Sequence, residues 1–306
     1  MNMIPILEND AGLPTLCARR NHALAALAEQ ALIAEAELTP KPGLVDRRGS
    51  GAHSDLSLHL MRLSATSLRP FFAAMGAIST GRDLDISLRQ DLAAIGRNAE
   101  RKMYHVTGGV NTHKGAIWNL GLLVAVAARR DVTYSGEIAA DAGTIARLPD
   151  RPQPALITHG DIVRKRYGIN AGARAEAASG FPHVLESGLV TLRIVRAAKL
   201  PEEICRLDAL LSLMSQVDDT CVLYRGGGDA LSVVKSRAQA VLLAGGCATA
   251  EGRRRLRKLD HELIARHASP GGSADLLAAT IFLDAVERQS EIRRDHSRWE
   301  EQDGAS

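Results

Sequence analysis

The sequence predicts an all-α protein, a single multi-helix bundle with its active site in the loops between helices. Apolar residues recur every three or four positions over long segments, which is the spacing of one face of a helix. No alternation of polar and apolar residues is long enough to require a β-strand. Aromatic residues make up only 3% of the 306 residues, and the chain is instead rich in Ala and Leu, which favour helices.

The periodic apolar positions place the helices along the chain. The first clear series spans residues 56–78 and contains Pro70, which predicts either a kink or the start of a new helix there. Two further series cover residues 88–103 and 204–214. Other helices are predicted at residues 21–38, 113–129, 136–147, 183–198, 229–247, 252–267 and 274–290.

These helices are expected to form one catalytic domain over residues 16–290. Three prolines within residues 148–154 forbid a helix in that segment. We interpret it as a surface excursion, because chemically suggestive residues lie on both sides of it; a linker between two domains is the alternative. The N-terminus (1–15) and the C-terminal tail (291–306) are predicted to be flexible, since unanchored chain ends fray.

Composition and charge exclude several classes of protein. Hydrophobic residues make up 45% of the chain, too many for a disordered protein, and a net charge of +3 is too small to indicate nucleic-acid binding. The four cysteines form no CxxC pair, which argues against a zinc site or a disulfide framework. The most apolar stretch, residues 115–128, is too short to cross a membrane and fits a buried helix. The N-terminus does not resemble a signal peptide, so a cytoplasmic protein is predicted.

The first cluster of chemically suggestive residues lies within residues 39–55. Two prolines and a glycine fix an extended loop here rather than a helix, so Lys41 is carried on a stiff support. Asp46, His53 and Asp55 follow it. The structural alternative is a capped turn that begins the next helix while the other side chains face water.

The second cluster, TGGVNTHKG, directly precedes the buried-looking helix. Asn111 or Thr112 can cap this helix and leave its first backbone N–H groups free for an anion, where Lys114 adds a positive charge. Glu100, on the preceding helix, could face the same space. A plain helix cap is the alternative, but His113 and Lys114 would be unusual immediately before so apolar a helix.

The third cluster, DDTCVLYRGGGD, covers residues 218–229. Adjacent carboxylates, including Asp219, are followed by Arg225 and three glycines, a combination that suits a metal and a polyphosphate. The glycines alone are weak evidence, because no GK[ST] sequence and no Rossmann spacing accompany them. A flexible loop between helices is the alternative.

The fourth cluster covers residues 269–277. Ser273 is a suitable N-cap residue for the next helix, and Asp275 in the first turn suits the helix dipole. This structural interpretation is sufficient by itself. The functional alternative is that Gly271 and Gly272 let a ligand approach the backbone.

Taken together, these segments resemble one family, the triphosphoribosyl-dephospho-CoA synthases. The matching motifs are TPKPGLVD with GAHSD, AERKM with TGGVNTHKGAI, GARAEAASGFP, DDTCVLYRGG and SPGGSADLLA, which occur in the family's order over residues 31–283. PKPGLVD combined with NTHKGA is far more specific than any single glycine motif. The chain departs from the family pattern at Leu56, where Met is frequent, and at Tyr224, where His is common and which supplies no imidazole.

The resemblance implies a helical enzyme that uses ATP and 3′-dephospho-CoA. A ribose hydroxyl of dephospho-CoA would attack C1 of the ATP ribose, the triphosphate would stay attached, and adenine would leave. The product is the precursor of the prosthetic group on the acyl carrier subunit of malonate decarboxylase or citrate lyase, and the pattern is closer to the malonate decarboxylase branch. A second transferase and the acyl carrier protein are the implied partners.

For this reaction we expect the four clusters to share the chemistry. Three basic residues would bind phosphates: Lys41, Lys114 and Arg225. Asp219, with Glu35 or Glu100, would bind Mg²⁺ and stabilise the oxocarbenium-like state of a glycosyl transfer. His53 or His113 would be the base, and Asp55 would orient it or coordinate the metal. Further substrate contacts are expected from Asp46, Asn111, Arg174, Gly271, Gly272 and Ser273.

Two other functions stay open on the sequence. A metal-dependent helical hydrolase of nucleotides or ADP-ribosyl groups would use the same loops but transfer to water, and so would not need dephospho-CoA. A non-catalytic scaffold or carrier-binding module would not need so many charged residues in loops fixed by glycine and proline. The Ala- and Leu-rich helices leave a homodimer open as well, because they can bury a dimer face or only the core.

Overall fold

The structure is a computed structural model that describes residues 16–129, 134–152 and 158–303, with side chains described as far as Ile292 except that of His159. It confirms the predicted all-α fold, since these residues form helices and loops, with one isolated bridge between Asp46 and Gly49 and no strand. The elements are α1 (Leu16–Glu37), α2 (Leu58–Ser79), α3 (Ile86–Val106), α4 (Lys114–Ala127), α5 (Ser135–Arg147), α6 (His159–Tyr167), α7 (Ala173–Ala178), the π-helix η1 (Val184–Leu189), α8 (Val190–Ala197), α9 (Glu202–Gln216), α10 (Thr220–Leu243), the 3₁₀-helix η2 (Gly246–Ala248), α11 (Ala250–Ala265) and α12 (Gly271–Asp303).

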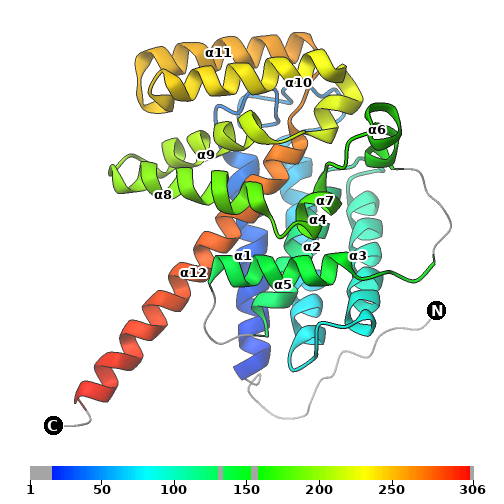
Figure 1. Ribbon diagram of the computed structural model, residues 1–306, viewed down its shortest axis with the longest axis vertical. Helices are drawn as coiled ribbons and strands as arrows, with labels where there is room; N and C mark the ends of the chain where they lie inside the picture. Colours follow the sequence, from blue (N-terminus) through cyan, green and yellow to red (C-terminus); the bar gives the residue numbers. More distant parts are fainter. Residues whose placement is uncertain (1–15, 130–133, 153–157, 304–306) are drawn as a thin grey trace.

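The helices form two groups that are joined by α12 (Figure 1). In the first group α1 packs against α2, α2 packs against α3 and α4, and α5 crosses α4. In the second group α9 packs against α8 and α10, and α10 pairs with α11 at the top of the view. The N-terminal part of α12 packs against α1, α4 and α9, while its C-terminal end extends away from both groups.

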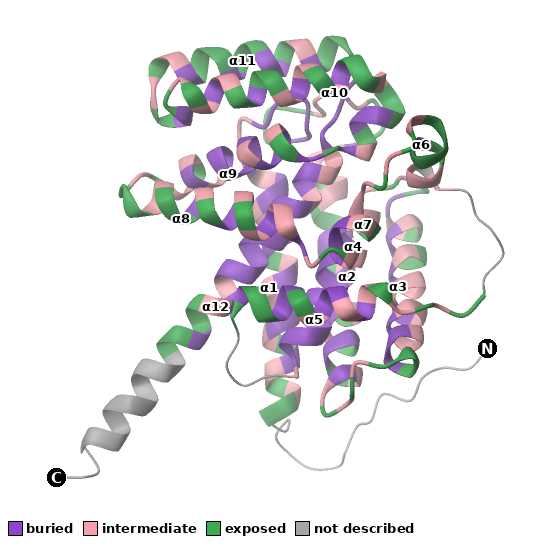
Figure 2. Cartoon of the chain, in the orientation of Figure 1, coloured by how far each residue is buried: buried purple, intermediate pink, exposed green. Residues whose placement is uncertain are grey.

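Helix α4 is the centre of the first group. Its sequence is apolar on every side, the pattern of a helix that is enclosed by protein. Every residue from Asn119 to Ala127 is buried, and α2, α3, α5 and α12 surround it (Figure 2). The predicted buried helix at 113–129 is therefore confirmed. Among the described residues, no helix is long and apolar enough to span a membrane.

Two expectations about helix ends are wrong, and a third is wrong in one of its two alternatives. Pro70 lies inside the continuous helix α2 and does not start a new one, while the kink stays a prediction. The expected loop at 220–229 is part of α10, which Gly227 interrupts with a φ of 72°. Helix α12 begins at Gly271, so Ser273 lies inside the first turn and is not the N-cap. Two short helices, α6 and α7, were not predicted from the apolar pattern.

The predictions for the chain ends are tested only in part. The N-terminal segment 1–15 lies outside the described residues. At the other end the backbone of α12 continues as helix to Asp303, well past the predicted limit of residue 290. The flexibility of both ends stays a prediction.

The loop between α1 and α2 is held in place by two carboxylates. Asp46 accepts the backbone N–H of Lys41 at 2.9 Å and the guanidinium of Arg48 at 2.7 Å. Asp260, on α11, accepts the backbone N–H of Gly43 at 2.9 Å and the Arg48 guanidinium at 2.7 Å. The extended loop predicted from its prolines is thus fastened to the second group of helices, which fixes the position of Lys41.

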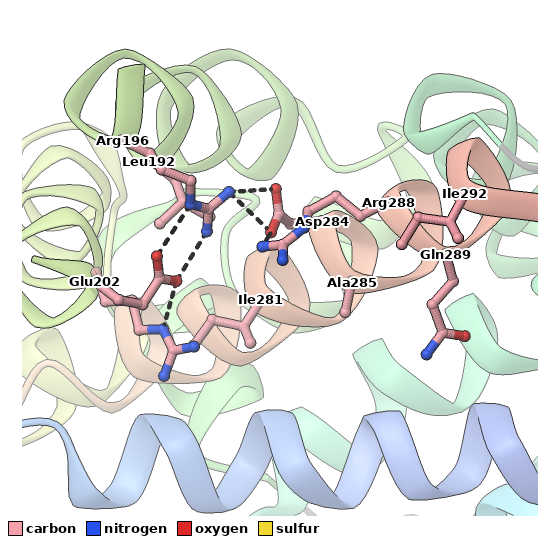
Figure 3. A pocket seen from close by; sticks show the side chains of 10 residues that line it. Leu192, Arg196, Glu202, Ile281, Asp284, Ala285, Arg288, Gln289 and Ile292 are labelled. Carbon is pink, nitrogen blue, oxygen red and sulfur yellow. Dashed lines mark hydrogen bonds and ion pairs between the residues drawn. The ribbon is translucent and has the colours of Figure 1, made fainter. Parts of the chain in front are cut away.

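Ion pairs also join α8, α9 and α12 (Figure 3). Arg196 contacts Glu202 at 2.8 Å and Asp284 at 2.9 Å. A pocket of about 270 Å³ lies beside them. Because the carboxylates of this pocket are already paired with arginines, we interpret it as a structural joint between the helices.

Candidate functional site

A cleft of about 620 Å³ lies where the two groups of helices meet. It is within the size range of pockets for small-molecule ligands. It is lined by most of the residues predicted for the site: Glu35, Lys41, His53, Asp55, Glu100, Asn111, Lys114, Arg174, Asp219, Arg225, Gly271 and Gly272. Asp46, His113 and Ser273, which were also predicted, do not line it. The structure therefore brings residues from all four sequence clusters to one place.

A buried ion pair lies at one side of the cleft. The Lys41 ammonium contacts the Glu35 carboxylate, and their side chains are only 1% and 4% exposed. Glu35 comes from the last turn of α1, and Lys41 comes from the loop that Asp46 and Asp260 hold. Breaking such a pair by removing one partner leaves a buried charge uncompensated, which makes each partner depend on the other.

Asp219 is bound to the N-terminal ends of two helices. One of its oxygens accepts the backbone N–H groups of Cys221 at 2.9 Å and Gly272 at 3.3 Å. The other accepts the backbone N–H and the hydroxyl of Ser273 at 2.8 and 3.0 Å. The Asp219 side chain therefore caps α10 and α12 together, and Ser273, which does not line the cleft, takes part in this cap.

Asp275 is a site residue that the sequence analysis assigned only to the helix dipole. It lines the cleft from the first turn of α12 and accepts the backbone N–H of Ala116 at the start of α4. Burial and the neighbouring carboxylates Glu35 and Asp219 raise the pKa of Asp275 well above its usual value. No Lys or Arg nitrogen within the described residues lies in ion-pair contact with it. A basic carboxylate thus faces the cleft.

The N-terminal ends of α4, α10 and α12 converge on the cleft, through Lys114, Thr220 and Gly271. Helix N-termini carry partial positive charge, so their convergence favours an anionic ligand. Glycine is present at two of these ends because a side chain would not fit there. A side chain at Gly115 would collide with Asp275, and one at Gly272 would crowd Asp219. The sequence analysis offered Gly272 as a place where a ligand approaches the backbone; in the structure the side chain of Asp219 lies next to this backbone.

The two predicted histidines occupy different environments. His53 lines the cleft, contacts the Ser269 hydroxyl through Nε2 at 2.8 Å, and has its pKa lowered to about 4 by burial and by Arg225. His113 is buried and does not line the cleft; its Nδ1 atom contacts the Ser64 hydroxyl at 2.8 Å. Burial and the nearby Lys41 lower the pKa of His113 to about 3. Both imidazoles are therefore neutral at pH 7.

Cationic groups stand at the rim of the cleft. Lys114 lies 3.4 Å from Glu100, and its backbone N–H is accepted by Asn111 at 3.2 Å. Arg174 is exposed and lies over the Trp118 ring, 6.0 Å from its centroid. Arg225 is exposed on α10. Because none of these three side chains is buried, each can turn towards a bound polyanion.

The described residues contain no group of three or more His, Cys, Asp or Glu side chains that could hold a metal ion. Of the carboxylates predicted as ligands, Glu35 is paired with Lys41 and Glu100 with Lys114, while Asp219 caps two helices. Mg²⁺ commonly takes only one or two carboxylates together with substrate phosphates. The donor set fits a cation that arrives on a triphosphate rather than one held by the protein alone.

The sequence analysis also missed a carboxylate–imidazole pair. Glu176, on α7, and His183, just before η1, both line the cleft, and their side chains lie 2.6 Å apart. Glu176 belongs to the GARAEAASGFP motif, but the apolar pattern of that segment is too short to show which side chains face inward.

Comparison with known proteins points to one family. The family model described as ATP:dephospho-CoA triphosphoribosyl transferase matches residues 21–294. A protein of Stutzerimonas stutzeri (strain A1501), named "Probable 2-(5''-triphosphoribosyl)-3'-dephosphocoenzyme-A synthase", is 55% identical over 266 residues, covering 86% of this chain and 91% of that protein. Proteins of the same name from Azotobacter vinelandii and Pseudomonas aeruginosa (strain UCBPP-PA14) are 53% and 54% identical, covering 85% and 89% of this chain and 90% and 93% of theirs.

Proposed function

Because this chain belongs to the ATP:dephospho-CoA triphosphoribosyl transferase family, we propose that its cleft transfers the 5-triphosphoribosyl group of ATP to the 2′-hydroxyl of 3′-dephospho-CoA. The protein is a transferase of the triphosphoribosyl-dephospho-CoA synthase type. The observation that supports this cleft as the site is the meeting of three helix N-termini, the rim cations and the basic carboxylate Asp275 in one place. The first two features suit a triphosphate, and the third suits the activation of a hydroxyl.

In the reaction, the bond between C1 of the ATP ribose and N9 of adenine breaks, and its electron pair leaves with adenine. The 2′-oxygen of dephospho-CoA forms the new bond to C1, and its proton goes to Asp275. A general base works best when its pKa lies near the working pH, and the pKa of Asp275 is raised towards that range. His53, with a pKa of about 4, is a weaker base, and His113 does not line the cleft.

The remaining cleft residues act on charge. Asp219 lies near Asp275, and its carboxylate stabilises the positive charge that develops on the ribose; the charge of Glu35 is compensated by Lys41. Lys114, Arg174 and Arg225 bind phosphate oxygens from the rim. Asp219 has a second task, because it holds α10 and α12 in position around the substrate.

Mg²⁺, bound mainly by the triphosphate, would neutralise part of its charge beside the cleft carboxylates. Excess EDTA is therefore expected to lower the rate of adenine release at least about 100-fold, since a bound cation is worth several kcal/mol of charge stabilisation. The rate is measured by chromatography of free adenine, and added Mg²⁺ should restore it. Full activity in excess chelator would contradict the magnesium proposal.

The product would serve as the precursor of the prosthetic group of an acyl carrier protein. We place it in the malonate decarboxylase branch because of the overall motif pattern, with citrate lyase as the alternative. A second transferase would then attach the group to the carrier.

The reaction is tested by incubating the purified protein with ATP, Mg²⁺ and 3′-dephospho-CoA. Adenine is expected only when dephospho-CoA is present, together with an equal amount of the triphosphoribosyl adduct, identified by mass. Release of adenine or phosphate without dephospho-CoA would instead indicate a hydrolase. A folded protein that releases neither would contradict the proposed reaction.

A further inference from the structure

The Glu176–His183 pair lies in the cleft but has no task in the reaction as described so far. The His183 Nδ1 atom lies 2.6 Å from one Glu176 oxygen, and the His183 backbone N–H donates to the other at 2.9 Å. The Glu176 side chain is 8% exposed and the His183 side chain is 35% exposed. The carboxylate is thus enclosed, whereas the imidazole is open to the cleft.

The backbone around this pair sets the direction of the imidazole ring. Residue Phe181, between the two partners, is fully buried and has a φ of 58°, a conformation that is uncommon for a residue with a side chain. Its backbone N–H donates to the carbonyl of Glu176 at 3.0 Å, which closes the turn from α7 to η1. The ring is therefore positioned by a buried anchor and by two hydrogen bonds to one carboxylate.

The charges around His183 favour its protonated form. Its hydrogen bond to Glu176 raises the pKa of His183 above the usual value, against the effect of burial; Asp218 also raises it, and Lys235 lowers it. Since Nδ1 donates to Glu176, Nε2 is the atom that remains for a ligand. His53, the other described histidine of the cleft, has a pKa of about 4 and is neutral under the same conditions.

We propose that His183, positioned by Glu176, is the general acid that protonates the departing adenine. As the C1–N9 bond breaks, N9 takes the bonding pair and the purine develops negative charge. The Nε2 proton of His183 passes to N7, so adenine leaves neutral and His183 becomes a neutral imidazole. Asp275 has meanwhile taken the hydroxyl proton, and exchange with water restores both groups. The inference rests on the proposed transfer reaction and adds to it a second proton transfer, from His183 to adenine.

The test compares wild-type protein with H183Q on two substrates, ATP and 7-deaza-ATP, which has carbon in place of N7. General acid catalysis is worth about 10²–10⁴-fold, so H183Q is expected to lose that much in kcat with ATP while its KM for ATP changes little. Wild-type protein should lose a similar factor when ATP is replaced by 7-deaza-ATP, and H183Q should lose almost nothing more. His261 is exposed on α11, so H261Q serves as the matched control and should keep wild-type rates.

The rate as a function of pH gives an independent readout. The acid must be protonated, so the wild-type rate should fall as pH rises through the raised pKa of His183. In E176Q the pKa-raising charge is gone, and this fall should move to lower pH; in H183Q it should disappear.

Three results would overturn the inference. One is an H183Q protein with wild-type kcat. Another is a rise in KM for ATP with unchanged kcat, which would indicate phosphate binding instead. The third is an H183Q protein that still loses the full wild-type factor on 7-deaza-ATP. If wild-type protein makes no adduct at all, the proposed function has failed and not this inference.

Discussion

Replacing Lys41 with methionine is expected to lower the free energy of unfolding by about 3–5 kcal/mol. The substitution leaves the Glu35 carboxylate buried without its cation, and removing one partner of a buried ion pair costs about that much. Urea unfolding followed by circular dichroism measures the change. K258M is the matched control, because Lys258 is exposed on α11 and its loss should change stability by less than about 0.5 kcal/mol.

A double-mutant cycle separates the structural role of this pair from its role in catalysis. E35Q alone should also destabilise the protein, because Lys41 then keeps a buried charge with no counter-charge. The double variant E35Q/K41M contains neither charge and should recover most of the lost stability. Its turnover should nevertheless stay at least about 100-fold below wild type, since the double variant lacks two charged groups that line the cleft. Stability losses that simply add in the double variant would contradict the coupling.

Replacing Asp275 with asparagine is expected to lower kcat by about 10²–10⁴-fold, the usual contribution of a general base. Asparagine keeps an oxygen for the backbone N–H of Ala116, so the fold should be retained, but an amide cannot take the hydroxyl proton. The KM values of both substrates should change little. Asp229, an exposed residue of α10 outside the cleft, provides the matched control D229N.

The comparison with D219N separates the proposed base, Asp275, from the carboxylate that caps two helices. In D219N, an amide group would meet backbone donors at one of its two ends, so we expect a loss of stability of about 2–4 kcal/mol from weakened caps on α10 and α12. A stable D219N protein with greatly reduced kcat, beside a nearly normal D275N, would contradict Asp275 as the base and make Asp219, which the sequence analysis assigned to Mg²⁺ binding and oxocarbenium stabilisation, the main catalytic carboxylate.

The sequence predicts the fold class and most long helices, because apolar periodicity over many turns is decided locally. α6 and α7, of 9 and 6 residues, were missed because so few turns give no clear period. The segment after Asp219 was misjudged for a different reason. Its glycines suggested a loop, but the helix continues through them and is interrupted at Gly227 alone.

The site residues could be predicted by type and by segment, but their tasks depend on contacts between distant parts of the chain. Asp219 and the backbone of Gly272 are 53 positions apart, so no local pattern reveals that this carboxylate is a cap. The sequence explained Asp275 by its position in the first turn of a helix. Its burial beside Glu35, 240 positions earlier in the chain, arises only on folding and so left no local pattern. Asp46, which was predicted to bind substrate, does not line the cleft and holds the loop that carries Lys41.

The hydrogen bond from Gly43 to Asp260 connects residues 217 positions apart and has a consequence for how this enzyme can vary. Helix α11 contributes no residue to the lining of the cleft, yet one of its side chains determines where the loop bearing Lys41 lies. A substitution at Asp260 would therefore act on a substrate that it never touches. Substitutions on α11 can therefore shift the Lys41 ammonium slightly while every residue that lines the cleft stays unchanged.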